Sequence, residues 1–173
     1  MEFKKIQLNG FKSFAEKTNF LIEKGLTGIV GPNGCGKSNI VESLRWCMGE
    51  TSAKSMRGSG MEDVIFSGTS NKPSKNIAEV VLSLNNENKD GPHQYNDLDE
   101  IEIRRKIEKD KGSKFYINNK EVRAKDAQMF FADLSTGAHS PSLISQGRIG
   151  ALVTAKPSDR RAILEEAAGI AGL

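Results

Sequence analysis

The sequence has few cysteines, few aromatic residues and no long apolar run. Its two cysteines, Cys35 and Cys47, are too few for a disulfide framework, so we expect a reducing, cytoplasmic environment. No stretch approaches the roughly 18 consecutive apolar residues of a membrane span, and the N-terminus lacks the apolar core of a signal peptide. These shortages exclude membrane-spanning and disulfide-rich classes and predict a protein with no membrane partner.

Length and charge do not determine the fold, but the distribution of charge indicates which partners to consider. The 173 residues suit one domain, and the net charge is only +3. Residues 101–125, the basic block, carry nine basic and four acidic groups. This block either contacts DNA phosphates without sequence specificity or forms a solvated face. Its two aromatic residues, Phe115 and Tyr116, are too few for a base-stacking platform.

Apolar periodicity predicts an α/β fold in which strands dominate the first two thirds of the chain. Strands are expected at 3–8, 18–22, 26–30, 64–66, 78–84, 101–107 and 114–118. Helices are expected at 37–48, at 127–134 and from Pro157 onward.

The residues from Gly31 to Ser38 fit the phosphate-loop pattern G-x-x-x-x-G-K-[ST], after a predicted strand and at the start of a predicted helix. Glycines let backbone N–H groups converge on phosphate oxygens, and the helix N-terminus adds partial positive charge. Lys37 is predicted to reach the β- and γ-phosphates of ATP, and Ser38 to supply a hydroxyl ligand to Mg²⁺. The alternative is an ordinary glycine-rich turn. The other nucleotide contacts expected in this segment are Gly31, Pro32, Asn33, Gly34, Cys35, Gly36 and Asn39.

A complete hydrolytic site also needs an acidic residue, normally at the end of an apolar strand, to hold Mg²⁺ and orient water. The apolar run 80–84 ends in Asn85, and Asp133 follows a run with helical spacing. The sequence therefore predicts a chain that binds a nucleotide without completing the chemistry alone.

Several segments, in order, resemble the structural maintenance of chromosomes (SMC) family. They are 8–14 with Lys12 and Ser13, the phosphate loop, an arginine loop at 56–66 with Arg57, a Q-loop at 145–149 with Gln146, and the base of a coiled coil at 155–170. The resemblance implies a P-loop NTPase fold with a mixed β-sheet, in which residues 1–157 are the N-terminal lobe of an ABC-type ATPase head. Residues 158–173 would begin the coiled-coil arm helix. The family's signature motif, Walker B acid and catalytic glutamate lie in a C-terminal lobe, which accounts for the missing acid.

The resemblance also implies roles for single residues. Gln146 would contact Mg²⁺ and the attacking water, and together with Lys37 would form this lobe's contribution to catalysis. Arg57 would lie near the nucleotide phosphates and help to sense a second head. Lys12 and Ser13 would reach the phosphates or the edge of the nucleotide, the alternative being a solvated loop.

From these features we expect the ATP-binding half of an ATPase that acts in chromosome condensation and segregation. The implied partners are the C-terminal lobe, a second head in a homodimer, a kleisin-type accessory subunit and double-stranded DNA at the nucleoid. Three alternatives stay open. They are a head lobe of a Rad50-, RecN- or RecF-type DNA-repair ATPase, a small P-loop kinase, and a DNA-binding module in which the loop is only structural.

Overall fold

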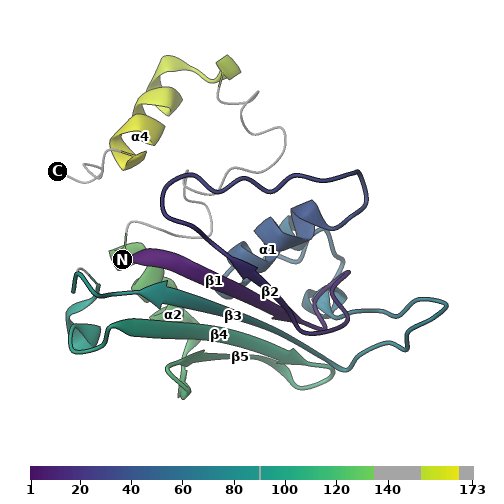
Figure 1. The fold of residues 1–173 in the computed structure, drawn as a ribbon. Coiled ribbons are helices and arrows are strands. Elements are labelled where there is room, and N and C mark those ends of the chain that lie inside the picture. Colours follow the sequence, from purple (N-terminus) through teal and green to yellow (C-terminus); the bar gives the residue numbers. More distant parts are fainter. Residues whose placement is uncertain (90, 135–152, 168–173) are drawn as a thin grey trace.

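The computed structural model describes residues 1–89, 91–134 and 153–167 (Figure 1). At its centre is a six-stranded sheet in the order β2-β1-β3-β4-β5-β6. The strands are β1 (Glu2–Asn9), β2 (Thr18–Leu21), β3 (Ile77–Asn85), β4 (Glu100–Glu108), β5 (Gly112–Ile117) and β6 (Lys120–Val122). The helices are α1 (Lys37–Cys47), α2 (Ala124–Asp133) and α4 (Pro157–Ala167), with 3₁₀ turns η1 (Lys54–Met56), η2 (Met61–Val64) and η3 (His93–Tyr95).

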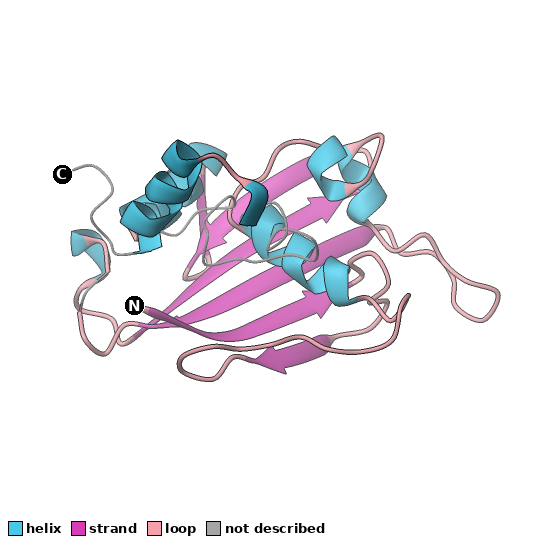
Figure 2. Cartoon of the chain, turned by 90° about the horizontal axis from the view of Figure 1, so that it is seen from above, coloured by secondary structure: helices cyan, strands magenta, loops and turns pink. Residues whose placement is uncertain are grey.

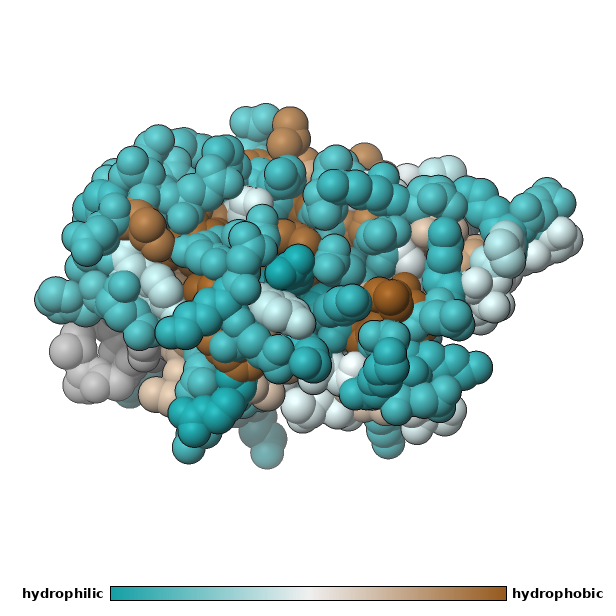
Figure 3. Space-filling model, turned by 90° about the horizontal axis from the view of Figure 1, so that it is seen from below, coloured by the Kyte–Doolittle hydropathy of each residue, from teal (hydrophilic) through white to brown (hydrophobic). Residues whose placement is uncertain are grey.

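The core lies between one face of the sheet and the helices α1 and α2 (Figure 2). Because successive side chains of a strand point to opposite faces of the sheet, β1, β3 and β4 each direct every second side chain into this core. Leu82 of β3, for example, pairs with Ile6 of β1 and Ile103 of β4, and all three are almost fully buried. The opposite face is largely hydrophilic (Figure 3).

The expected strands at 26–30 and 64–66 are wrong. Residues 26–30 form no strand, and the segment runs as an extended loop between β2 and α1 (Figure 1), with Leu26 97% and Val30 92% exposed. Val64 ends η2, while Ile65 makes an isolated bridge with Phe11. A short β-rich run becomes a strand only where a neighbouring strand supplies backbone partners along its length. None of the described strands pairs with 26–30, and residues 64–66 bond to the loop at 10–12 rather than to a strand of the sheet.

The expected mixed sheet is also wrong for the strands that the structure describes, because all of them pair antiparallel. The connections between β4 and β5 and between β5 and β6 are tight hairpins, which are too short for a parallel crossover, and the longer β3–β4 connection also joins antiparallel neighbours. The other expected strands and helices are confirmed to within a few residues. α4 begins at Pro157, although the division into 1–157 and 158–173 stays a prediction.

Candidate nucleotide-binding site

The phosphate loop depends on glycine at two turns that only glycine adopts easily. Gly34 and Gly36 have φ angles of 81° and 93°, in the left-handed region. A Cβ atom at Gly36 would also lie 2.8 Å from the Oγ of Ser13 and 3.3 Å from the ring of Phe14. Gly36 therefore allows the loop at 11–14 to approach the N-terminus of α1 closely.

The ammonium group of Lys37 reaches back to the loop that precedes the helix. Its Nζ donates to the carbonyl oxygen of Pro32 at 2.6 Å and to that of Gly31. Beside it, at the N-terminus of α1, lies a cavity of about 180 Å³. The residues that line this cavity are Asn33, Gly34, Gly36, Lys37, Ser38, Asn39 and Arg57.

All seven lining residues are among those that the sequence predicts to contact a nucleotide. Lys12 and Ser13 lie next to the cavity without lining it. The Oγ of Ser13 accepts a hydrogen bond from the Nδ2 of Asn39 at 2.8 Å. The Nζ of Lys12 donates to Glu42 at 2.6 Å, so in this structure its ammonium group is directed at a carboxylate rather than at a phosphate position. Gln146 lies outside the described residues.

Sequence reasoning missed Glu42, a buried carboxylate behind the cavity. Its side chain is 8% exposed and forms ion pairs with Lys12 and Arg57. The only signal in the sequence is its spacing, three residues after Asn39 and therefore on the same face of α1. Without knowledge of the loops that meet this face, such a glutamate is indistinguishable from a solvated one.

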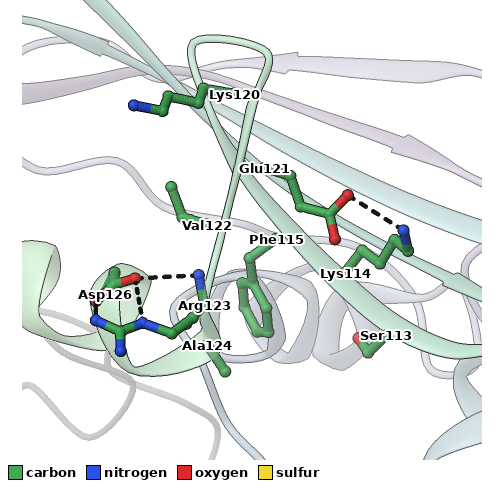
Figure 4. Close-up of a pocket in the computed structure, with 9 residues that line it drawn as sticks. All are labelled: Ser113, Lys114, Phe115, Lys120, Glu121, Val122, Arg123, Ala124 and Asp126. Carbon is green, nitrogen blue, oxygen red and sulfur yellow. Dashed lines mark hydrogen bonds and ion pairs between the residues drawn. The ribbon is translucent and has the colours of Figure 1, made fainter.

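A second hollow, an open groove of about 700 Å³, lies between the β5–β6 hairpin and the start of α2 (Figure 4). Lys114 pairs with Glu121 at 3.1 Å, and Arg123 pairs with Asp126 at 2.9 Å. The hydrogen bond from Arg123 lowers the pKa of Asp126. These four charges neutralise one another in pairs, which leaves Lys120 as the unpaired charge among the residues that line the groove.

The structure divides the basic block into buried and exposed groups. Arg105 is 3% exposed and faces the core, so it belongs neither to a DNA-binding face nor to a solvated one. Lys120 is exposed and Lys106 is half-buried, and neither makes an ion pair with another described residue. The charge available to a partner is therefore smaller than the sequence count suggests.

Two features are absent from the described ranges 1–89, 91–134 and 153–167. No helix there is long and apolar enough to cross a membrane. No group of three or more His, Cys, Asp or Glu residues there is placed to hold a metal ion.

A glycine-rich loop that leads into a helix, with a lysine at the first helical position and a small polar cavity beside it, defines a P-loop nucleotide-binding protein. The chain belongs to the RecF/RecN/SMC N terminal domain family, whose model matches residues 2–147. This confirms the family that the sequence motifs indicate.

Within this family, the chain is similar to bacterial chromosome partition proteins. The chain is 56% identical to the chromosome partition protein Smc of Rhodopseudomonas palustris and 58% identical to that of Cereibacter sphaeroides, in both cases over all 173 residues. It spans only 15% of the length of each. In sequence it corresponds to the N-terminal head region of these proteins.

Solved structures agree with this placement. A crystal structure of the SmcHead bound to the C-winged helix domain of ScpA superposes with a TM-score of 0.86 at 34% identity, over 99% of this chain and 52% of that one. Another, from work on ATP-driven dimerization and DNA stimulated activation of SMC ATPases, gives 0.82 at 32% identity, over 96% and 99%. The fold is therefore that of the N-terminal domain of an SMC head.

Proposed function

We propose that this chain is the ATP-binding lobe of an SMC-type ATPase head that acts in chromosome partition. The observation that carries the proposal is the cavity at the N-terminus of α1, lined entirely by the phosphate-loop residues, Asn39 and Arg57. Backbone N–H groups at a helix N-terminus, together with Lys37, suit the phosphates of ATP. Lys37 and Gly31–Ser38 would hold the β- and γ-phosphates, and Arg57 would approach them from the arginine loop.

Mg²⁺ would bind together with the nucleotide rather than in a protein cage. Ser38 lines the cavity and would offer its hydroxyl, while phosphate oxygens and water would supply the other ligands, as Mg²⁺ prefers. Bound there, the ion would neutralise phosphate charge. Gln146 is a further proposed contact to the ion and to the attacking water.

The site supports ATP binding in this lobe but not hydrolysis by it alone. Its cavity of about 180 Å³ is well below the roughly 300–1,000 Å³ of ordinary ligand pockets. Asp133, the acid considered from sequence, ends helix α2 instead of following a strand. We infer that the remainder of ATP lies against surfaces from outside this chain, namely a C-terminal lobe and a second head.

The extended segment at 26–30 marks where the C-terminal lobe would join. Leu26 and Val30 are almost fully exposed, and the backbone between β2 and α1 has no strand partner among the described residues. A strand from the second lobe would supply those backbone hydrogen bonds and cover the apolar side chains. The relatives' heads also suggest a kleisin-type subunit as a further partner, since one is bound to the C-winged helix domain of ScpA.

This proposal predicts negligible ATPase activity from the chain alone and activity when the C-terminal lobe is added as a second chain, a mixture we call the reconstituted head. Leu26→Asp should leave the thermal stability of the lone chain within about 0.5 kcal/mol, because the side chain is already in water. It should prevent reconstitution, because a charge would be buried between the lobes. Turnover of ATP is measured with each chain alone and with both.

Leu98→Asp is the matched control, because Leu98 is also an exposed leucine at 42% but lies in the β3–β4 loop. It should reconstitute like the unaltered chain. Robust turnover by the lone chain would refute the divided site, and phosphate transfer to a nucleoside would favour a small kinase.

For DNA, we propose a sequence-independent contact through the part of the basic block that faces away from the core. Exchanging Lys106 and Lys120 for Glu should weaken duplex binding by the reconstituted head and flatten its salt dependence. Each lost phosphate contact should reduce the slope of log affinity against log salt by about 0.9. The measurement is a salt titration of binding to two unrelated duplexes.

Exchanging Lys17 and Lys72 for Glu makes the same change in net charge at two exposed loop positions far from the basic block in sequence, and this variant serves as the control. An unchanged salt slope in the Lys106 and Lys120 variant would show that this face is only solvated.

A further inference from the structure

Glu42 has an unusual set of partners for a buried carboxylate. Its Oε2 accepts from the Nζ of Lys12 at 2.6 Å, and its Oε1 pairs with the Nε of Arg57. Lys12 also donates to the carbonyl oxygen of Met56, next to Arg57 in the chain. A buried carboxylate is costly unless it is paired, and here it is paired with cations from two separate loops.

Asn39 repeats this arrangement one turn earlier on α1. Its Oδ1 accepts from a terminal guanidinium nitrogen of Arg57 at 2.7 Å, and its Nδ2 donates to the Oγ of Ser13 at 2.8 Å. Asn39 and Glu42 share a helix face because they are three residues apart. Each of them therefore joins the 11–14 loop to the arginine loop across the same face of the phosphate-loop helix.

These contacts determine where the guanidinium of Arg57 can go. Its backbone is in the left-handed region with φ 54°, and two of its N–H groups are held by α1. An arginine has five N–H donors, so three remain without a partner among the described residues. The side chain is 57% exposed and lines the cavity beside Lys37. The guanidinium is therefore held by α1 on one side, and on the other side its remaining N–H groups can donate to a ligand in the cavity.

We propose that Glu42 is a positioning residue that fixes the guanidinium of Arg57 at the mouth of the phosphate cavity. A phosphate group that enters beside Lys37 then meets donors that are already oriented, which avoids an ordering cost at the moment of reaction. The inference rests on the proposed function, because it requires a phosphate ligand in this cavity. Glu42 itself does not line the cavity, so it acts through Arg57.

A double-mutant cycle with Glu42→Gln and Arg57→Ala in the reconstituted head tests this role. If Glu42 acts through Arg57, each single change should lower kcat about tenfold, and the pair should lower it no further than Arg57→Ala alone. KM for ATP should stay within about twofold, because Lys37 and the loop are intact. A purely electrostatic role would instead tighten ATP binding, with kcat unchanged, because removing a negative charge makes the site more positive.

Glu79→Gln is the matched control, because Glu79 is also a partly buried glutamate paired with an arginine, Arg104 at 3.8 Å, but lies on β3 away from the cavity. It should leave kcat unchanged. Should Glu42→Gln fail to fold, the cycle is run with Lys12→Met present throughout, so that no buried ammonium loses its partner. Independent, multiplicative losses in kcat would overturn the inference in either background.

A further control separates this inference from the proposed function. Lys37→Ala should abolish ATP binding by the reconstituted head. Retained binding would refute the nucleotide site itself. If Lys37→Ala abolishes binding but Glu42→Gln and Arg57→Ala lower kcat independently and multiplicatively, only the positioning role is refuted.

Discussion

Lys37→Ala is expected to abolish ATP binding by the reconstituted head. The ammonium of Lys37 is held between two carbonyl oxygens of its own loop, next to a cavity that the helix N-terminus makes electropositive. Hydrogen bonds to charged groups contribute about 1.5–3 kcal/mol each, so losing contacts to two phosphates should weaken affinity by at least about 100-fold. Titration of the head with a fluorescent ATP analogue measures this directly.

Lys54→Ala is the comparison for this experiment, because Lys54 is an exposed lysine in η1 that does not line the cavity. It should bind ATP like the unaltered protein. Thermal unfolding of both variants separates loss of binding from loss of structure, and ATP affinity preserved in Lys37→Ala would contradict the assignment of the site.

Arg105→Ala is expected to lower the free energy of unfolding of the chain by about 3 kcal/mol. The guanidinium donates to the carbonyl oxygens of Trp46 in the last turn of α1, at 2.7 Å, and of Glu50 just past its end, at 2.6 Å. It also donates to the Oγ of Ser113 at 2.8 Å. It also lies between the rings of Trp46 and Phe115, at 4.5 and 4.6 Å from their centres. Alanine would leave a cavity and remove the guanidinium donors from both carbonyl groups. Urea unfolding measures the loss, and the melting temperature should fall by roughly 6–12 °C.

The neighbouring residue provides the control for that prediction. Arg104 points to the other face of β4, 27% exposed, where it lies over the ring of Tyr116 and pairs with Glu79 at 3.8 Å. Arg104→Ala should cost no more than about 1 kcal/mol, as exposed ion pairs do. Equal losses for the two arginines would contradict the structural role of Arg105.

The charge on Arg105 does not itself stabilise the fold. Burial lowers the pKa of Arg105 from its usual value to about 10, so the group stays protonated at pH 7 but binds its proton less tightly when folded. This effect opposes folding below about pH 10 and diminishes as the pH rises above that value. Stabilisation therefore comes from the hydrogen bonds and ring contacts. Arg105→Met, which retains volume and removes the buried charge, should cost less than Arg105→Ala.

Local patterns were sufficient for the regular elements and for the phosphate loop. Alternation along 101–107 and helical spacing along 37–48 depend on neighbours a few residues away, so they can be recognised without the fold. The same is true of Gly36 and Lys37, because a phosphate loop is built from consecutive residues. The family assignment followed from the order of several such segments.

Longer-range relations could not be predicted in this way. The run at 26–30 has strand composition, but a strand needs a backbone partner, and none of the described strands pairs with it. Arg105 looks like any other member of the basic block until alternation along β4 turns it toward Trp46. Glu42 becomes part of the site only because two distant loops each bring it a cation.

The sequence by itself thus determined the family, most of the strands and helices and the residues that line the phosphate cavity, because these follow from local spacing and from the order of motifs along the chain. Only the tertiary structure decided which charges are buried, that the predicted strand at 26–30 has no partner among the described strands, and what holds Arg57 in place. Burial, strand pairing and side-chain orientation depend on contacts between residues that are far apart in the chain, so local sequence patterns do not predict them.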